Sequence, residues 1–391
     1  MSPVNASATA ARMPDAGSHR VRALTGPELT RLLTYNSDGG STDLLIRRCA
    51  GKAGRQGVPP IGTAFLTLGG FGAGLALTLA GSELLARGLT RLGTKLEFSE
   101  GLLGLLAALG ADSPELSAAV IAILAGAGDV GVGVVVGSNL FNLAALLGIS
   151  AIVAGGIRVR RGPLVLDATV GLAVMLATAL MVAGLASPTV VAVIALPLSA
   201  VYALALALPR RWLAHIDPLL GGLPHDLIEI PYEVTHDRPI VAHRSWTPVL
   251  LLPIALAAVV GGSYVMVHAA LSSQSLLHMS SAVLGTVVLA ALTSLPNLWV
   301  ALHFARANRG TALMSAAMNS NTINLLGGLV IPALFVGAGF ARGSLGYFGW
   351  LLDLTLLAVL APLPHRRLSR TAGAAIIALY LIFAGLRVAG I

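Results

Sequence analysis

The chain has 391 residues, of which 56% are hydrophobic and 11% are charged, and its formal net charge is +8. Soluble proteins carry about 25% charged residues, so this composition excludes a soluble monomer and indicates a multispanning membrane protein whose main partner is the lipid bilayer. The single cysteine, Cys49, excludes an internal disulfide. Because most of the positive charge comes from arginines between apolar runs, it is a topology signal, and we expect no nucleic-acid binding.

Residues 1–60 are polar and rich in Ser, Ala and Arg. They lack the apolar region of a signal peptide, so we expect a flexible tail here. A transmembrane helix needs about 20 apolar residues, and ten such runs follow: 62–90, 99–124, 130–154, 164–184, 188–208, 246–271, 281–305, 311–338, 345–363 and 371–390. The fold class is therefore all-α. The charged segment 209–245 separates five runs, within 61–208, from five more, within 246–391.

Lysine and arginine accumulate in the loops on the cytoplasmic side of a membrane protein. With ten spans, the loops after the odd-numbered spans share one side. That side holds Arg87, Arg91, Lys95, Arg158, Arg160, Arg161, Arg210, Arg211, Arg238, Arg244, Arg306, Arg309, Arg366, Arg367 and Arg370. The opposite side holds Arg342 and Arg387 outside the tail. We therefore predict that the first set is cytoplasmic, with 209–245 as a cytoplasmic loop, and that both termini face outward.

The two halves of the chain repeat. The segment "ADSPEL" at 111–116 matches "TSLPNL" at 293–298, and "GSNLFNL" at 137–143 matches "NSNTINL" at 319–325. Both pairs are 182 residues apart, as are Pro114 and Pro296. Because five spans is an odd number, the second copy must be inverted in the membrane. Two inverted five-helix repeats are typical of secondary transporters, whose ion site lies near the bilayer midplane.

Each repeat has a proline inside an apolar run. Proline lacks an N–H group and leaves the carbonyl four residues earlier without its helical partner. Those carbonyls belong to Gly110 and Leu292. An unpaired carbonyl in lipid must face protein, water or an ion, and hard cations prefer oxygen ligands. We therefore predict two broken helices whose carbonyls are candidate ligands.

Asp112 and Glu115 are the strongest site candidates. Residues three apart share a helix face, and a charged side chain at the bilayer centre costs roughly 2.5–3.5 kcal/mol or more, so such residues are functional by default. We expect both to bind a metal cation or a proton that neutralises them. Neutral oxygens in the two repeats would complete the site: Ser138, Asn139, Asn142, Thr293, Ser294, Asn297, Asn321 and Asn324, with Asn319 and Ser320 beside them.

These motifs resemble the two α-repeats of the sodium/calcium exchanger family, within the cation/Ca²⁺ antiporter superfamily. The resemblance covers about residues 66–390. It implies alternating-access exchange of Na⁺ or H⁺ against Ca²⁺ or another cation, without a cofactor. By position, Glu115 matches the ligand glutamate of the first repeat and Asn142 matches the amide of the third span. Thr293 and Ser294 match the hydroxyl and carbonyl ligands of the second repeat.

The chain also departs from the family pattern. Asn297 stands at the position of the second ligand glutamate, Asn324 where many members have aspartate, and Asn319 where glycine is usual. Asp112 occupies the position of a ligand serine. Both carboxylates therefore lie in one half, a lopsided arrangement that bears on ion selectivity, stoichiometry and coupling.

Three functions remain open from the sequence. The first is a cation antiporter built on Asp112 and Glu115. The second is a cation/H⁺ exchanger in which one of these acids carries the proton, and the third is a non-transporting membrane sensor or scaffold on the same fold. An enzyme is not expected, because the His-Glu-x-x-His, Gly-x-Ser-x-Gly and Gly-x-Gly-Asp motifs are absent from the spans. The short soluble parts favour a bacterial inner membrane, and the sequence names no protein partner.

Two further acids lie inside apolar runs, namely Asp167 in the fourth span and Asp353 in the ninth. Arg158, Arg160 and Arg161 precede Asp167 closely, so we expect one of them to pair with it at the membrane interface. A role for Asp167 in proton coupling is the alternative.

Overall fold

The computed structural model describes residues 61–96, 100–207, 246–277, 279–306, 310–339 and 344–390. The described residues all belong to one compact unit, Pro59–Ile391. The expected tail at 1–60 and the expected loop at 209–245 lie outside the described residues.

Helices cover the first five predicted runs. They are α3 (Ile61–Lys95), α4 (Glu100–Ala111), α5 (Ser113–Leu124), α6 (Gly128–Asn142), the π-helix η2 (Leu143–Ile149), α7 (Ser150–Val153), α8 (Arg161–Val182) and α9 (Pro188–Ala207). The second run is thus divided between α4 and α5 at Asp112, as the proline predicted. The third run is one continuous helical path through α6, η2 and α7.

Helices also cover the last five runs. They are α12 (Thr247–Leu250), α13 (Leu252–Leu277), α14 (Ser281–Val283), the π-helix η4 (Leu284–Leu289), α15 (Ala290–Thr293), α16 (Leu295–Arg306), α17 (Gly310–Leu325), the π-helix η5 (Leu326–Val330), α18 (Ile331–Val336), α19 (Leu345–Leu360) and α20 (Arg370–Val388). The seventh run is divided at Ser294, which lies 182 residues after Asp112. Both repeats also place a π-helix directly after their asparagine motif.

Seven helical stretches of the described chain are long and apolar enough to cross a membrane. Three further apolar helices, Ser113–Leu124, Ser281–Thr293 and Leu345–Leu360, are shorter than a full span. Two of these three border the breaks at Asp112 and Ser294, which divide the predicted second and seventh spans into shorter helices. The fold is therefore helical and membrane-spanning.

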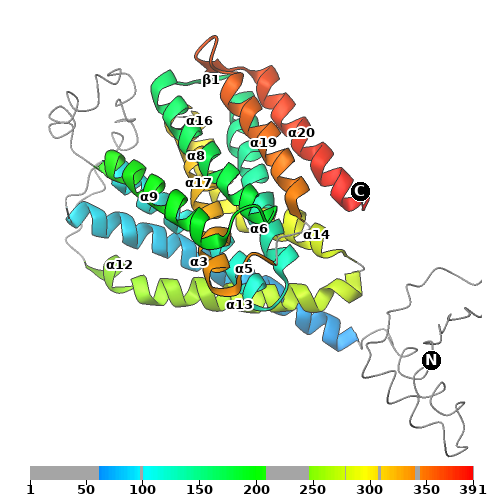
Figure 1. Ribbon diagram of the computed structural model, residues 1–391. Helices are drawn as coiled ribbons and strands as arrows, with labels where there is room; N and C mark the ends of the chain where they lie inside the picture. Colours follow the sequence, from blue (N-terminus) through cyan, green and yellow to red (C-terminus); the bar gives the residue numbers. More distant parts are fainter. Residues whose placement is uncertain are drawn as a thin grey trace, which may run out of the picture. The chain divides into compact units, whose positions relative to one another are not determined.

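Helices α3 and α13 form a long, close pair along one side of the helical unit (Figure 1). Gly74, Gly81 and Gly88 recur every seven residues on α3. Gly74 meets the backbone of Met266, Gly81 meets the backbone of Val259, and Gly88 meets the side chain of Leu252, so α3 and α13 run in opposite directions. A Cβ atom added at Gly81 would lie 2.9 Å from the backbone nitrogen of Val259. The absence of side chains at these glycines allows this close approach, as is common between membrane helices.

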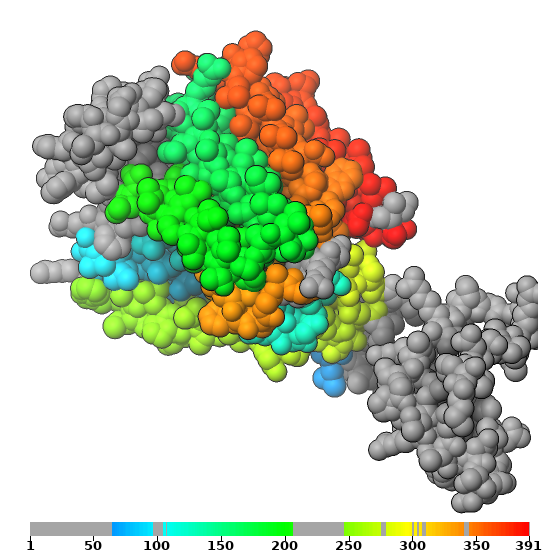
Figure 2. Space-filling model, viewed as in Figure 1, coloured from blue at the N-terminus to red at the C-terminus, as the bar shows by residue number. Residues whose placement is uncertain are grey.

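The helices differ in how deeply they are buried. In the most apolar part of Gly128–Val153, 89% of the residues are buried, whereas the corresponding fraction for Pro188–Ala205 is 22%. The path of α6 is therefore the core, and α9 packs against α8 on the outside, where Figure 2 shows its green surface. Val193, Ile194 and Val201 of α9 are more than half exposed. An exposed apolar face of this kind is suited to lipid.

Two short strands join loops from the two halves. In β1 (Ile157–Arg158) and β2 (Arg367–Leu368), Ile157 pairs with Leu368 and Arg158 with Arg367 in antiparallel register. The first strand follows the third predicted span and the second follows the ninth. The structure therefore brings together two loops that the charge pattern assigns to one side of the membrane.

Candidate functional site

The two acids predicted to bind cations lie at the start of α5 and are buried. Asp112 is 1% exposed and Glu115 is 0% exposed. Asp112 is the N-cap residue of α5, with Pro114 in the first turn, and its side chain makes no capping hydrogen bond. Both carboxylates are therefore available for contacts with other helices.

The second half of the chain supplies those contacts. The Asn297 side-chain amide donates to Oδ1 of Asp112 at 2.9 Å and to Oε1 of Glu115 at 3.2 Å. The Ser294 hydroxyl donates to Oε1 of Glu115 at 2.8 Å, and the Ser320 hydroxyl donates to Oδ1 of Asp112, also at 2.8 Å. All of these donors are neutral. Within the described residues no lysine or arginine forms an ion pair with either acid, so the negative charge must be balanced by something other than a basic side chain.

The asparagine motifs of α6 and α17 form a second layer of contacts. The Asn139 amide donates to the backbone carbonyl of Asn321 at 3.2 Å, and the Asn324 amide donates to Oδ1 of Asn139 at 3.1 Å. The Asn142 amide donates to the Ser320 hydroxyl at 3.0 Å, which links this layer to Asp112. The predicted polar groups therefore form two hydrogen-bonded groups that include both repeats. One contains Asn142, Ser320, Asp112, Asn297, Glu115 and Ser294, and the other contains Ser138, Asn139, Asn321 and Asn324.

The two remaining hydroxyls of the predicted site donate to backbone carbonyls of their own helices. The Ser138 hydroxyl donates to the carbonyl of Val135 at 3.0 Å, and the Thr293 hydroxyl donates to that of Leu289 at 2.8 Å. A hydroxyl oxygen also has two acceptor lone pairs. These oxygens can therefore still serve as ligands while their hydrogens are engaged.

Five side-chain oxygens of these two groups are buried and accept no hydrogen bond from the described residues. They are Oδ2 of Asp112, Oε2 of Glu115 and Oδ1 of Asn142, Asn321 and Asn324. Leaving a buried acceptor unpaired costs about 1–3 kcal/mol, and more for a charged group. Carboxylate and amide oxygens are the ligands that hard cations take. The described residues contain no cluster of three or more His, Cys, Asp or Glu side chains, so a cation here would need the amides as well as the two acids.

The helix breaks are narrower than the sequence suggested. The backbone amide of Asp112 still donates to Ala108, and that of Leu116 donates to Asp112. The carbonyl of Gly110, deprived of its helical partner by Pro114, accepts hydrogen bonds from Ser113 at 2.7 Å and Ser82 at 2.8 Å. These two hydroxyls therefore replace the missing helical donor, so the Gly110 carbonyl does not need an ion as its partner. No described hydroxyl donates to the carbonyl of Leu292 in the second repeat.

Glycine 137 explains how α6 reaches the site. A Cβ atom at this position would lie 2.6 Å from the Cα atom of Thr286 and would also collide with its carbonyl oxygen. The glycine of the Gly-Ser-Asn motif thus lets α6 pack directly on η4 of the other half, with Ser138 and Asn139 following it. This packing positions the asparagine layer.

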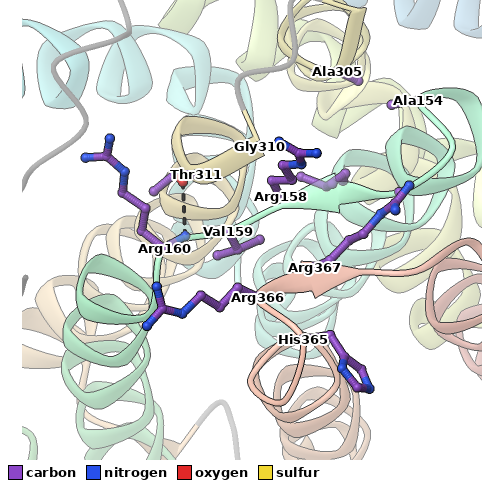
Figure 3. Close-up of a pocket in the computed structure, with 12 residues that line it drawn as sticks. Ala154, Arg158, Val159, Arg160, Ala305, Gly310, Thr311, His365, Arg366 and Arg367 are labelled. Carbon is purple, nitrogen blue, oxygen red and sulfur yellow. Dashed lines mark hydrogen bonds between the residues drawn. The ribbon is translucent and has the colours of Figure 1, made fainter.

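A cavity lies elsewhere, where the loops that hold β1 and β2 meet the end of α16 and the start of α17 (Figure 3). Its volume is about 1090 Å³, and its lining includes Arg158, Arg160, Arg366 and Arg367, with His365 beside them. Arg367 donates to the carbonyl of Gly155 at 2.6 Å. No acidic side chain lines this cavity. The positive charges of these arginines repel cations, so this cavity is not a candidate for the cation site.

The sequence of the whole helical unit decides the family. A sequence model of the sodium/calcium exchanger protein family matches residues 66–209 and 247–389. The chain belongs to the sodium/calcium exchanger family. The two matched segments leave out the tail and the central charged segment, and both contain one Pro-containing motif and one asparagine motif.

Similar proteins come from bacteria, an archaeon and mammals. An uncharacterized membrane protein of Methanocaldococcus jannaschii is 26% identical over 325 residues, which are 81% of this chain and 96% of that protein. CaxA of Alkalimonas amylolytica, named as a candidate antiporter, is 44% identical over 85 residues, and the inner membrane protein YrbG of Escherichia coli is 31% identical over 125 residues. This chain spans only 27% of the length of CaxA and 37% of the length of YrbG in these matches.

A solved structure shares the architecture. A structure of the sodium–calcium exchanger NCX_Mj, soaked with Na⁺ and Sr²⁺, matches with a TM-score of 0.53 and 26% identity over 82% of this chain and 98% of that one. The same exchanger soaked without Na⁺ and Ca²⁺ matches with a TM-score of 0.51. This exchanger-family chain therefore shares the helical fold of NCX_Mj over most of its length.

One sequence expectation is wrong. Asp167 does not pair with Arg158, Arg160 or Arg161, because its carboxylate is buried and its hydrogen-bond partners are the hydroxyls of Tyr202 and Ser315. The expectation followed from proximity in sequence. The arginines precede α8 or begin it, whereas Asp167 is turned inward toward α9 and α17.

Two residues that the sequence reading missed contribute to the site or lie near it. Ser82 of α3 donates to the Gly110 carbonyl, and Tyr202 of α9 donates to Asp167. A serine inside an apolar run was the available signal for the first, since a membrane helix retains a hydroxyl mainly where it finds a partner. A tyrosine in an apolar run gave no comparable signal, because tyrosine is common in membrane helices.

Proposed function

We propose that this chain is a secondary-active cation antiporter that moves its substrates by alternating access through a site built on Asp112 and Glu115. The observation that carries the proposal is the pair of buried carboxylates, each with one unpartnered oxygen and with neutral partners from the opposite half. A transported cation would supply the missing positive charge, and its departure would leave a state that favours rebinding.

The proposed membrane arrangement is ten spans as two inverted five-helix repeats, 61–208 and 246–391, with 209–245 as a cytoplasmic loop between them. Its support is the 182-residue periodicity: Asn139 bonds to its own counterpart, Asn321. The contacts of the acids follow the same relationship. Asp112 bonds to the counterpart of Glu115, namely Asn297, and Glu115 bonds to the counterpart of Asp112, namely Ser294. Reciprocal contacts of this type are expected where two related repeats meet around an axis.

The substrate class is a hard inorganic cation. Two carboxylates can neutralise one divalent ion or two monovalent ions, and the surrounding ligands are all oxygen. Relatives named as sodium/potassium/calcium exchangers in mouse and human are 37% and 36% identical over 81 residues, which favours Na⁺ and Ca²⁺ as the first ions to test. We place the protein in a bacterial inner membrane, in line with the name of YrbG.

The test is ion uptake by purified protein in lipid vesicles. With an outward Na⁺ gradient, we expect Ca²⁺ uptake by the wild type and its loss in Glu115→Gln, because the amide removes the charge and retains the shape. The control is Glu83→Gln, the same substitution at an exposed residue of α3 that pairs with Arg87. Uptake by Glu115→Gln at the wild-type rate would contradict the proposal.

A cation/H⁺ exchanger is the second candidate. The unpartnered oxygens of Asp112 and Glu115 can each hold a proton as readily as they can ligate a metal, so one site could alternate between the two. Uptake driven by a pH gradient in the absence of Na⁺ would favour this candidate. Uptake that needs Na⁺ and ignores the pH gradient would remove it, and a lack of any transport or ion binding would favour the sensor or scaffold function.

A further inference from the structure

A third buried carboxylate lies outside the cation site. Asp167 of α8 is 4% exposed. Its Oδ1 atom lies 2.6 Å from the Tyr202 hydroxyl of α9, and its Oδ2 atom accepts a hydrogen bond from Ser315 of α17. Ionisable groups buried among apolar membrane helices mark proton or ion sites more often than structural positions. None of these contacts involves a residue of the cation site.

When Asp167 is ionised, the two hydrogen-bond contacts of the Tyr202 hydroxyl need one hydrogen more than the side chains supply. The Tyr202 hydroxyl lies 2.7 Å from Oδ1 of Asn319 as well as 2.6 Å from Oδ1 of Asp167. A phenol has one hydrogen, and both neighbouring atoms are oxygens that accept. One of the two short contacts therefore lacks a hydrogen. A proton on Asp167 restores the balance, since Asp167 then donates to Tyr202, and Tyr202 donates to Asn319.

The distances indicate a proton rather than a metal ion. Oxygen–oxygen separations of 2.6 and 2.7 Å are those of O–H···O hydrogen bonds. A Ca²⁺ ion lies about 2.3–2.6 Å from each of its oxygens, and it would hold two ligand oxygens further apart than this.

Within the described residues, the hydrogen-bond partners of Asp167 are neutral and no lysine or arginine forms an ion pair with it. The elements packed against α8 are α9, α17, α19 and η5. The titratable or charged side chains of these elements and of α8, apart from Asp167 itself, are Arg161, Tyr202, Tyr347 and Asp353. Of these, only Tyr202 hydrogen-bonds to Asp167. Arg161 and Asp353 are exposed.

We propose that Asp167 is a proton-binding site, separate from the cation-binding carboxylates, at which the carboxylate takes up one proton from solvent on Oδ1. The site lies one residue along α17 from the cation network. Asn319 contacts Tyr202, and the next residue, Ser320, donates to Asp112. Proton binding at Asp167 does not depend on the proposed transport function.

The test is infrared difference spectroscopy of the full chain in lipid, between alkaline and acidic buffer. A protonated carboxyl has a C=O stretching band that a carboxylate lacks. We expect the wild type to gain a band of a carboxyl shielded from water, and Asp167→Asn to lose that band. Asp353→Asn, the same substitution at an exposed aspartate of α19, should retain it. A spectrum of folded Asp167→Asn identical to that of the wild type would overturn the proposal and assign the missing hydrogen to a rotated Asn319 amide.

A second variant covers the case in which Asp167→Asn does not fold. Tyr202→Phe removes the hydrogen-bond partner of Oδ1 and retains the aromatic ring, so the band should shift in frequency. An unshifted band would show that it does not arise from Asp167. This measurement needs no transport, so its outcome is independent of the uptake test. Uptake without the band removes only the proton site, and the band without uptake removes only the antiporter.

Discussion

The side-chain amide of Asn297 lies between two acids and donates to both, at 2.9 Å from Asp112 and 3.2 Å from Glu115. The sequence resemblance places a ligand glutamate at this position, so the amide is the main chemical departure of this chain. An amide can donate a hydrogen bond, whereas a carboxylate cannot. Asn297 therefore stabilises the charges of Asp112 and Glu115, where a glutamate would have added a third negative charge.

The substitution Asn297→Glu tests this reading of the departure. It removes both hydrogen bonds and adds a carboxylate, so the protein without a cation should become less stable and Ca²⁺ should bind more tightly. Because ligand charge strongly tunes Ca²⁺ affinity, we expect a gain of about tenfold or more. Titration calorimetry on purified protein measures the affinity, and thermal unfolding with and without Ca²⁺ measures the stability.

The control for this variant is Asn297→Gln, which lengthens the side chain without adding charge. If Asn297→Gln and Asn297→Glu bind Ca²⁺ equally well, charge at position 297 does not set the affinity. The amide would then be important only for its shape.

The hydroxyl of Ser294 offers a milder test. It donates to the same oxygen of Glu115 as Asn297 does, at 2.8 Å. Removing one of two donors to a buried carboxylate should destabilise the cation-free protein by roughly 1–3 kcal/mol. The substitution also removes a predicted ligand oxygen, and we expect the loss of this contact with the cation to be the larger effect. We expect Ser294→Ala to weaken cation binding several-fold without abolishing uptake. Ser272→Ala, at an exposed serine whose hydroxyl bonds to its own helix, is the control, and equal affinities in the two variants would argue against a role for Ser294.

The sequence predicted the helical segments well because lipid imposes a simple rule on length and polarity. The ends of α8, α9, α19 and α20 lie within three residues of the predicted ends. It also predicted which polar residues meet, since Asp112 and Asn297 occupy matching motifs of the two repeats. Repetition carries three-dimensional information of this kind because related segments pack around a shared axis.

The sequence did not predict what lies across a helix face. Ser82 and Tyr202 contact Gly110 and Asp167 from the neighbouring helices in the chain, 28 and 35 residues away, and no motif links those positions. The prediction that an arginine pairs with Asp167 was wrong for the same reason, since nearness in sequence does not fix the direction of a side chain on a helix. The Gly110 carbonyl was predicted to lack its helical partner, but the hydroxyls that replace that partner depend on tertiary packing.

Glycine 137 should be intolerant of any side chain. A methyl group there meets the backbone of Thr286, which cannot move as a flexible side chain can. Overpacking of this type costs typically 1–3 kcal/mol, so Gly137→Ala should unfold at a lower temperature in detergent than the wild type. The control is Gly261→Ala in α13, where nothing lies within 4 Å of the added atom. Equal unfolding temperatures for the two variants would mean that α6 does not need close contact with η4.

The sidedness of the arginine cavity gives a test of topology. The loops that hold β1 and β2 meet the end of α16 and the start of α17 there, and the charge pattern places all of these on the cytoplasmic side. In a Cys49→Ser background, a cysteine replacing the exposed His365 should react with a membrane-impermeant maleimide only after the cell membrane is opened. A cysteine replacing the exposed Ser187, in the loop between α8 and α9, should react in intact cells. The reverse labelling pattern would invert the proposed orientation. Labelling of both positions in intact cells would place them on the same side of the membrane and would contradict the five spans predicted between them.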